Sequence, residues 1–219
     1  MRQLARVFLA FQLAALIAPA QHVEAFHKRS GPQREVIDRA ERPTERLQRI
    51  MVPLLRAADH PLPPEQIRVT VLDESEINAA SAGNGQYYVT TGLLRQANDD
   101  QLRGVLAHEI AHEDLGHPMK AQLLGTGLGI GTALLEQIFP GTGAVAPIAG
   151  TLITGQYSKP MELAADRHAV KLLQRAGYSK TTMINALAWL MRRNGDSGGG
   201  IFATHPATSE RIDALQKLR

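Results

Sequence analysis

Two histidines and a glutamate lie close together near the middle of the chain, in the segment His108-Glu109-Ile110-Ala111-His112. Residues four apart on an α-helix lie on the same face, so the imidazoles of His108 and His112 can share one metal ion. Glu109 follows the first histidine directly, where its carboxylate can reach a water molecule bound to that ion. The pattern therefore predicts metal-assisted hydrolysis. The alternative is an exposed polar helix face with coincidental spacing.

Two imidazoles leave a catalytic zinc site incomplete, because such a site usually takes three protein ligands and a water. A metzincin would need Gly and His where this chain has Leu115 and Pro118, and His117 is out of register by one residue. Glu162 is a candidate third ligand, and Asp166, four residues further on, could orient a ligand imidazole. The alternative for Glu162 is a carboxylate placed at a helix N-terminus by the helix dipole.

The pair of motifs His108-Glu109-x-x-His112 and Glu162-x-x-Ala165-Asp166 resembles the gluzincin zinc peptidases of family M48, which includes the HtpX and CAAX prenyl endopeptidases. The likeness is greatest to the soluble periplasmic branch of that family, and it spans about residues 45–219. It departs from the family pattern at Ser158-Lys159, where relatives often carry Ser-Arg. The resemblance also covers Asn78-Ala79, Tyr88-Val89-Thr90-Thr91-Gly92-Leu93-Leu94, and Thr204-His205-Pro206-Ala207-Thr208 with Arg211.

The resemblance implies a role for each matching residue of the metal site. His108, His112 and Glu162 would hold one Zn²⁺ per chain. Glu109 would act as the general base that activates the zinc-bound water, and then as the acid for the leaving amine. Zinc would polarise the carbonyl of the peptide bond that is cleaved.

Three further roles follow from the same resemblance. Asp166 would orient a ligand imidazole, and Ala79 to Ala82 would form an edge strand to which substrate adds as a further strand. His205 would either stabilise the oxyanion or close the site at rest; the alternative is an ordinary loop histidine before a proline. The remaining histidines are expected to be exposed or structural: His22, His27, His60, His117 and His168.

Helices must position most of these side chains. Residues 27–65 show roughly helical apolar spacing, with interruptions expected at Pro43 and Pro53. Asn98 is a favourable N-cap for a helix over 101–115, which Gly116 and Pro118 should end. Further helices are predicted over 160–176, 179–193 and 208–218.

The strand signals are fewer. Ile67 to Leu72 alternates with β-branched residues, and Asn84-Gly85 offers turn chemistry between two short extended runs. These segments predict a small antiparallel sheet of three strands. The expected fold is α+β and mainly helical, a zincin-like metalloprotease domain over residues 27–219 with the metal-binding histidines on one helix.

Residues 121–157 form a glycine-rich, apolar insertion whose single charge is Glu136. The uncharged run 137–158 is long enough to span a membrane, but Pro140 and Pro147 argue against one continuous helix. We expect a buried or surface-docked hairpin that offers peripheral contact with a membrane or a partner. The alternative is a membrane-inserted anchor.

The N-terminus has the features of a secretory signal peptide over residues 1–20, with cleavage at residue 25 as a fallback. A basic start precedes the uncharged run Val7 to Ala18, and Ala18-Pro19-Ala20 supplies small residues for cleavage. The sequence therefore predicts export to the periplasm or secretion. An uncleaved membrane anchor is the less favoured alternative.

The composition narrows the function further. The 219 residues contain no cysteine, which excludes disulfides and thiolate zinc sites and leaves His and Glu as ligands. The net charge of +3 falls to +1 without residues 1–20, and no basic and aromatic stripe is present, so no nucleic-acid partner is expected.

Taken together, these features predict a zinc metalloendopeptidase that acts on proteins or peptides, with misfolded cell-envelope proteins as candidate substrates. The alternative from another class is a zinc-stabilised periplasmic chaperone or interaction module with gated or little proteolysis.

Overall fold

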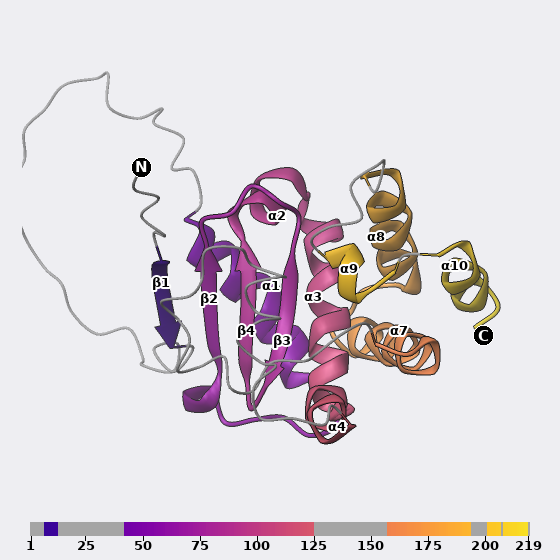
Figure 1. The fold of residues 1–219 in the computed structure, drawn as a ribbon, viewed down its shortest axis with the longest axis horizontal. Coiled ribbons are helices and arrows are strands. Elements are labelled where there is room, and N and C mark those ends of the chain that lie inside the picture. Colours follow the sequence, from indigo (N-terminus) through magenta and orange to yellow (C-terminus); the bar gives the residue numbers. More distant parts are fainter. Residues whose placement is uncertain (1–6, 13–41, 125–156, 194–200, 207, 219) are drawn as a thin grey trace, which may run out of the picture.

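The computed structural model describes residues 7–12, 42–124, 157–193, 201–206 and 208–218. A mixed sheet lies on one side of a central helix and a group of C-terminal helices lies on the other (Figure 1). The strands are β1 (Val7–Gln12), β2 (Arg68–Leu72), β3 (Ala79–Gly83) and β4 (Gln86–Thr90). The helices are α1 (Pro43–Arg56), α2 (Thr91–Gln96), α3 (Asp99–Asp114), α4 (His117–Leu124), α7 (Lys159–Arg175), α8 (Lys180–Arg193), α9 (Ile201–Thr204) and α10 (Ser209–Gln216), with a 3₁₀ turn at Pro64–Gln66.

The mainly helical α+β fold is confirmed, but the prediction of a purely antiparallel sheet is wrong. The strand order is β1-β2-β4-β3, and β2 and β4 are parallel. The turn at Asn84 and Gly85, both with positive φ, joins β3 to β4 as an antiparallel hairpin. Successive strands reverse direction, so placing β4 between β3 and β2 makes β2 and β4 parallel. The side chains of Tyr87, Tyr88 and Val89 on β4 are buried in this inner position.

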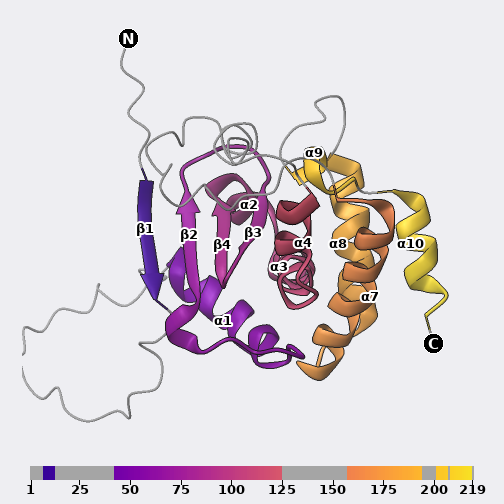
Figure 2. The same cartoon turned by 60° about the horizontal axis from the view of Figure 1, so that its bottom comes forward.

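The fourth strand, β1, comes from the segment expected to be a signal peptide. It pairs antiparallel with β2 at the edge of the sheet (Figure 2). This pairing says nothing about processing, so the signal peptide and its removal remain predictions. The domain boundary at residue 27 also lies outside the described residues.

Helix α3 is the element around which the described part of the chain packs. Asn98 caps it through a reciprocal pair of hydrogen bonds with Gln101, as the sequence predicted. Helix α1 and strand β3 contact α3 on one side, and α7 and α8 contact it on the other (Figure 1). Every residue from Leu102 to His112 is buried, which is unusual for a helix that carries several ionisable side chains.

Of the two interruptions expected in residues 27–65, a helix boundary does lie at Pro43, but Pro53 does not interrupt its helix. Pro43 begins α1, where its missing N–H costs nothing, and Pro53 lies inside that helix. Gly116, with a φ of +64°, lies just beyond the end of α3 and stops it as predicted. Pro118 does not terminate helical structure, because it lies in the first turn of α4.

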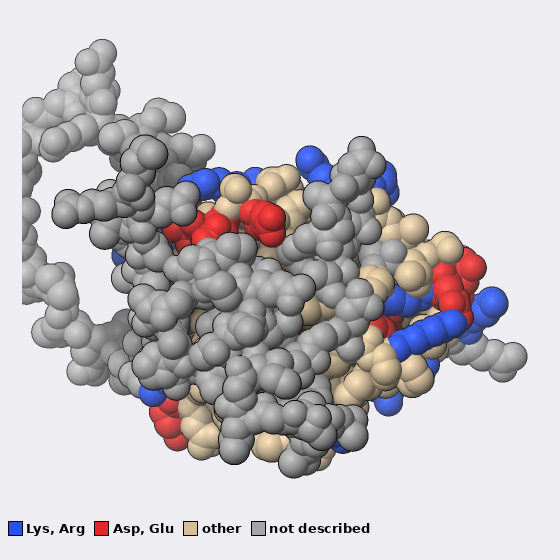
Figure 3. Space-filling model, viewed as in Figure 1, with Lys and Arg blue, Asp and Glu red and all other residues tan. Residues whose placement is uncertain are grey.

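None of the helices in the described ranges has the length and apolar character needed to cross a bilayer. The expected insertion at 121–157 falls almost entirely outside the described residues, so the hairpin and its membrane contact stay predictions. On the face shown in Figure 3, the visible acidic and basic side chains are interspersed around the margins.

The glycine of α3, Gly104, lies where α3 and α8 pack closely against each other. A Cβ built there would lie 2.4 Å from Cβ of Ala186 on α8 and 3.0 Å from the carbonyl oxygen of Thr182. Gly104 therefore allows the backbones of α3 and α8 to approach closely.

We predict that Gly104→Ala lowers the free energy of unfolding by about 1–3 kcal/mol through overpacking. Ala186→Gly in the same chain should relieve part of this loss, because it removes the closest atom. Urea denaturation of the two single variants and the double variant measures the coupling, and exposed Lys171→Ala serves as the control. Strictly additive losses would contradict the proposed contact.

Candidate metal centre

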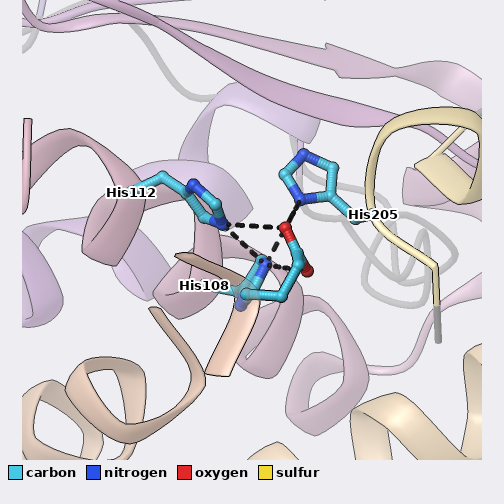
Figure 4. A group of neighbouring side chains, drawn as sticks. His108, His112 and His205 are labelled. Carbon is cyan, nitrogen blue, oxygen red and sulfur yellow. Dashed lines mark hydrogen bonds and ion pairs between the residues drawn. The ribbon is translucent and has the colours of Figure 1, made fainter. Parts of the chain in front are cut away.

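Four buried side chains from three parts of the chain converge beside α3. His108 and His112 lie on α3, Glu162 lies in the first turn of α7, and His205 directly follows α9. Their ligand atoms all lie within 4.8 Å of one another. Figure 4 shows the three labelled imidazoles pointing toward a single carboxylate.

The distances within this group fit a shared tetrahedral metal ion. Nε2 of His108 lies 3.1 Å from Nε2 of His112 and 3.3 Å from Nδ1 of His205. Oε1 of Glu162 lies 3.3 Å from Nε2 of His112 and 2.9 Å from Nδ1 of His205. Ligand atoms bound at about 2.0–2.1 Å to a tetrahedral ion would be about 3.3–3.4 Å apart.

The chemistry of the donor set also fits a cation. Three imidazole nitrogens and a carboxylate face one another, and hydrogen bonds can satisfy only part of this collection of lone pairs. Oε1 of Glu109 is buried and has no hydrogen-bond partner among the described residues, and Oε2 of Glu162 has only ion-pair contacts, with Arg211 and His108. A metal ion would supply the missing positive charge.

Burial removes the alternative of an exposed polar helix face. His108, Glu109 and His112 are 4%, 1% and 0% exposed, and Glu162 is 3% exposed. The apolar residues Leu102, Leu106 and Ile110 are buried on the same helix, so the whole helix lies inside the protein rather than at its surface. The described structure thus brings together all three predicted ligands.

Asp166 and Arg211 contact two of the ligand residues, His108 and Glu162. Oδ1 of Asp166 lies 3.1 Å from Nδ1 of His108, the nitrogen opposite the one that faces the other ligands. Arg211 donates from Nε and Nη2 to the two oxygens of Asp166, at 2.7 and 2.6 Å. Its Nη1 lies 2.7 Å from Oε2 of Glu162. The predicted orienting role of Asp166 agrees with this geometry, whereas Arg211 had entered only as part of a matching motif.

The electrostatics keep the carboxylates charged despite their burial. Burial by itself would raise the pKa of Asp166, but hydrogen bonds from Arg211 and His108 hold it below its ordinary value. Burial likewise opposes ionisation of Glu162, yet the neighbouring histidines lower its pKa well below the usual range. Burial would lower the pKa of His108, but Glu162 and Asp166 raise it to about 9.

Glu109 faces the same space without joining the ligand group. Its Oε2 accepts the backbone N–H of Ser81 on β3 at 3.0 Å. Its Oε1 lies 3.7 Å from Nε2 of His205. One carboxylate oxygen is therefore anchored to the edge strand, and the other lies beside the imidazole of His205, next to the ligand group, where a general base could reach a metal-bound water.

His205 lies inside the ligand group rather than at its margin. Its backbone N–H donates to the carbonyl of Ile201 at 2.8 Å, which places the imidazole at the end of α9. Nδ1 of His205 is one of the four candidate ligand atoms. It therefore stands at the fourth ligand position, which a catalytic zinc site usually leaves to water.

Two residues beside His112 were not recognised as part of the site from the sequence. His117 was expected to be exposed or structural; it is 5% exposed, and its Nδ1 lies 3.1 Å from Nδ1 of His112. The ring of Tyr157 packs against His112 with a centroid separation of 4.0 Å. The only sequence signal was the closeness of His117 to the motif, and the helix register argued against it.

A second group joins the far end of α3 to its neighbours. Asp114 accepts the backbone N–H groups of Asp59 and His60, at 2.7 and 2.8 Å. Nε2 of His168 on α7 lies 2.6 Å from the same carboxylate. Arg175 forms an ion pair with Asp59. Although Asp59, Asp114 and His168 could hold a metal ion, these contacts identify the group as a hydrogen-bonded link between α3, α7 and the end of α1.

The departure at Lys159 from the family pattern has little effect on the site. Nζ of Lys159 forms an ion pair with Glu210 on α10 at 2.7 Å, and both side chains are exposed. Exposed pairs of this kind contribute little to stability.

A buried ligand group on an HExxH helix, with a carboxylate directed at it, is the site of a metallopeptidase. Comparison with known proteins leads to the same class of enzyme. The model for peptidase family M48 matches residues 41–219, and the chain belongs to that family.

Two relatives illustrate the similarity. The chain is 31% identical over 211 residues to a protease HtpX homolog of Burkholderia thailandensis, covering 78% of this chain and 73% of the relative. It is 27% identical over 150 residues to the metalloprotease YcaL of Escherichia coli K12, covering 65% of this chain and 58% of the relative.

We predict that Asp114→Asn lowers the free energy of unfolding by about 1.5–3 kcal/mol at pH 7, because charge-assisted hydrogen bonds are lost. Burial would raise the pKa of Asp114, but the bonds from His168 and from the backbone of Asp59 lower it. A lowered folded-state pKa gives stability that is present above the unfolded value and is lost as the pH falls below about 4.

Urea unfolding at several pH values between 3 and 7, with exposed Asp213→Asn as the control, tests this. The difference between Asp114→Asn and the unchanged chain should shrink in acid. A difference that stays constant with pH would contradict the electrostatic explanation.

Proposed function

We propose that this chain is a zinc-dependent endopeptidase that holds one zinc ion through His108, His112 and Glu162. The observation that carries the proposal is the convergence of these buried ligand atoms at tetrahedral spacing. Glu109, whose Oε1 has no hydrogen-bond partner among the described residues and lies beside His205, would supply the general base. Imidazole and carboxylate ligands without cysteine fit a catalytic zinc site.

Zinc supplies a Lewis acid that polarises the peptide carbonyl and makes the attacking water more acidic. Glu109 takes a proton from that water as its oxygen attacks the carbonyl carbon. It then passes the proton to the nitrogen of the departing amine, which breaks the peptide bond. The hydrogen bond from the Ser81 backbone N–H to Glu109 fixes the carboxylate for both transfers.

The substrate in this proposal is an extended stretch of protein or peptide. Strand β3 is the last strand of the sheet and lies next to α3, and no further strand of the described residues pairs with its outer edge, where we place strand addition by the substrate. Its sequence, Ala79 to Gly83, consists of small residues that allow a second backbone to approach. Because the same strand holds Glu109 through Ser81, a substrate added here would lie beside the general base.

We further propose a role in cell-envelope protein quality control. The support is the predicted signal peptide at residues 1–20, which would export the chain to the periplasm or out of the cell. Misfolded envelope proteins would present the extended segments that an edge strand recognises. Peripheral membrane contact through residues 121–157 would place the enzyme near such substrates.

A second candidate function has one specific observation in its favour. His205 fills the fourth corner of the ligand group, where the attacking water must bind. A centre closed in this way would stabilise the fold without cleaving, as in a zinc-stabilised chaperone or interaction module. We propose instead that His205 closes the site at rest and must swing away before catalysis.

The central test separates metal binding from catalysis. Glu109→Gln should lower kcat/KM for casein cleavage about 10²–10⁴-fold, because the proton acceptor is lost. This variant should still contain one zinc per chain by mass spectrometry, because Glu109 is not a ligand. Glu162→Ala should lose both activity and zinc.

The outcomes have distinct meanings. Unchanged casein cleavage by Glu109→Gln would overturn the mechanism, and full zinc content in Glu162→Ala would overturn the ligand assignment. Chaperone activity that survives Glu109→Gln, in a chain without measurable cleavage, would support the second candidate.

The closing role of His205 predicts that His205→Ala raises the rate of casein cleavage several-fold. The substitution frees the fourth corner while His108, His112 and Glu162 remain. Exposed His60→Ala is the matched control and should leave the rate unchanged. A fall in kcat with unchanged zinc content would instead assign His205 to stabilisation of the oxyanion.

A further inference from the structure

The imidazole of His112 is contacted at both of its nitrogens. Nε2 lies 3.1 Å from Nε2 of His108 and 3.3 Å from Glu162, so it faces the ligand group. Nδ1 lies on the other side of the ring, 3.1 Å from Nδ1 of His117. Both histidines are buried, so the described surroundings leave bulk water little access to this nitrogen pair.

The protons on these two rings are constrained by simple chemistry. A neutral imidazole carries one N–H, and a nitrogen that binds a metal must offer a lone pair. If Nε2 of His112 binds zinc, its N–H must be at Nδ1. That N–H points at Nδ1 of His117, which must then offer a lone pair and carry its own proton at Nε2. The reverse arrangement would place the lone pair of His112 away from the metal.

The backbone explains how a residue five positions further on reaches back to His112. Helix α3 ends at Asp114, and Gly116 takes a φ of +64°, which a residue with a side chain rarely adopts. The chain turns there and starts α4 at His117. The side chain of His117 therefore approaches His112 from a new helix, which is why the register of α3 gave a misleading expectation.

A second contact restrains the plane of the same ring. Tyr157 is buried, and its ring lies 4.0 Å from the His112 ring between centroids, with an interplanar angle of 42°. Its backbone N–H donates to the carbonyl of Thr204, next to His205. Tyr157 therefore packs on the face of His112 while His117 contacts its edge.

We propose that His117 is a positioning residue of the metal centre. It accepts the Nδ1 proton of His112 and so holds that imidazole in the tautomer and orientation that present Nε2 to zinc. Tyr157 limits rotation of the ring. His117 does not touch the metal itself, and the inference rests on the zinc site proposed above.

The test compares two substitutions of His117. In His117→Asn, the side-chain oxygen takes nearly the place of Nδ1 and can still accept the proton of His112. In His117→Leu, the side chain fills a similar space but has no hydrogen-bond acceptor. We expect His117→Leu to weaken zinc binding about 10–100-fold in competition with a chromophoric chelator. His117→Asn should recover most of that affinity, and exposed His60→Leu should leave it unchanged.

A purely structural role gives a different result. In that case both His117 variants would lower the thermal midpoint of the metal-free protein by similar amounts, while their zinc affinities would equal that of the unchanged chain. Equal zinc affinity for His117→Leu and the unchanged chain overturns the inference but leaves the proposed function standing. Failure of the unchanged chain to bind zinc overturns both.

The tautomers can also be observed directly. Long-range ¹H–¹⁵N correlation spectra of the zinc-loaded protein should show His112 protonated at Nδ1 and His117 protonated at Nε2. A proton on Nδ1 of His117 would contradict the proposal whatever the zinc affinity.

Discussion

The rest of the site depends on the contacts that the buried guanidinium of Arg211 makes with two carboxylates. It donates to both oxygens of Asp166 and contacts Glu162, and it thereby joins α10 to α7. Two carboxylates without a cation would be costly in this interior, because desolvation opposes their charge. With Arg211 present, Asp166 stays ionised and orients His108. Glu162 contacts the same guanidinium and faces the histidines that lower its pKa. The metal centre therefore depends on α10, the last described helix, although its HExxH motif lies about a hundred residues earlier in the chain.

This arrangement explains why α3 carries charges inside the protein. A helix enclosed on one side by the sheet and α1, and on the other by α7 and α8, would ordinarily be apolar. Here each ionisable side chain of the HExxH segment has a particular partner: Asp166 for His108, His117 for His112, and the backbone N–H of Ser81 for Glu109. Such partners hold the ligands in position before the metal arrives, which lowers the entropic cost of binding it. The close approach at Gly104 brings α8 near enough to complete the enclosure.

The positions of Glu109 and His205 connect the proposed catalytic step with its proposed control. Glu109 is anchored to the edge strand that we propose as the substrate site, so substrate binding and the general base share one element. His205 directly follows α9, outside the segments that bear the other ligands, and it completes the ligand group. A ligand held on a short, separate segment can leave while the remaining three keep their places. This placement is the basis for our proposal that His205 closes the site at rest.

The sequence alone determined the features that depend on neighbours along the chain. The cap at Asn98, the shared face of His108 and His112, and the end of α3 at Gly116 follow from local hydrogen bonding and helix geometry. Only the tertiary structure decided the position of β4 inside the sheet, the placement of His205 among the ligands, and the turn that brings His117 to His112. These depend on which distant segments pack together, and that choice is made by the burial of the whole core rather than by any local pattern.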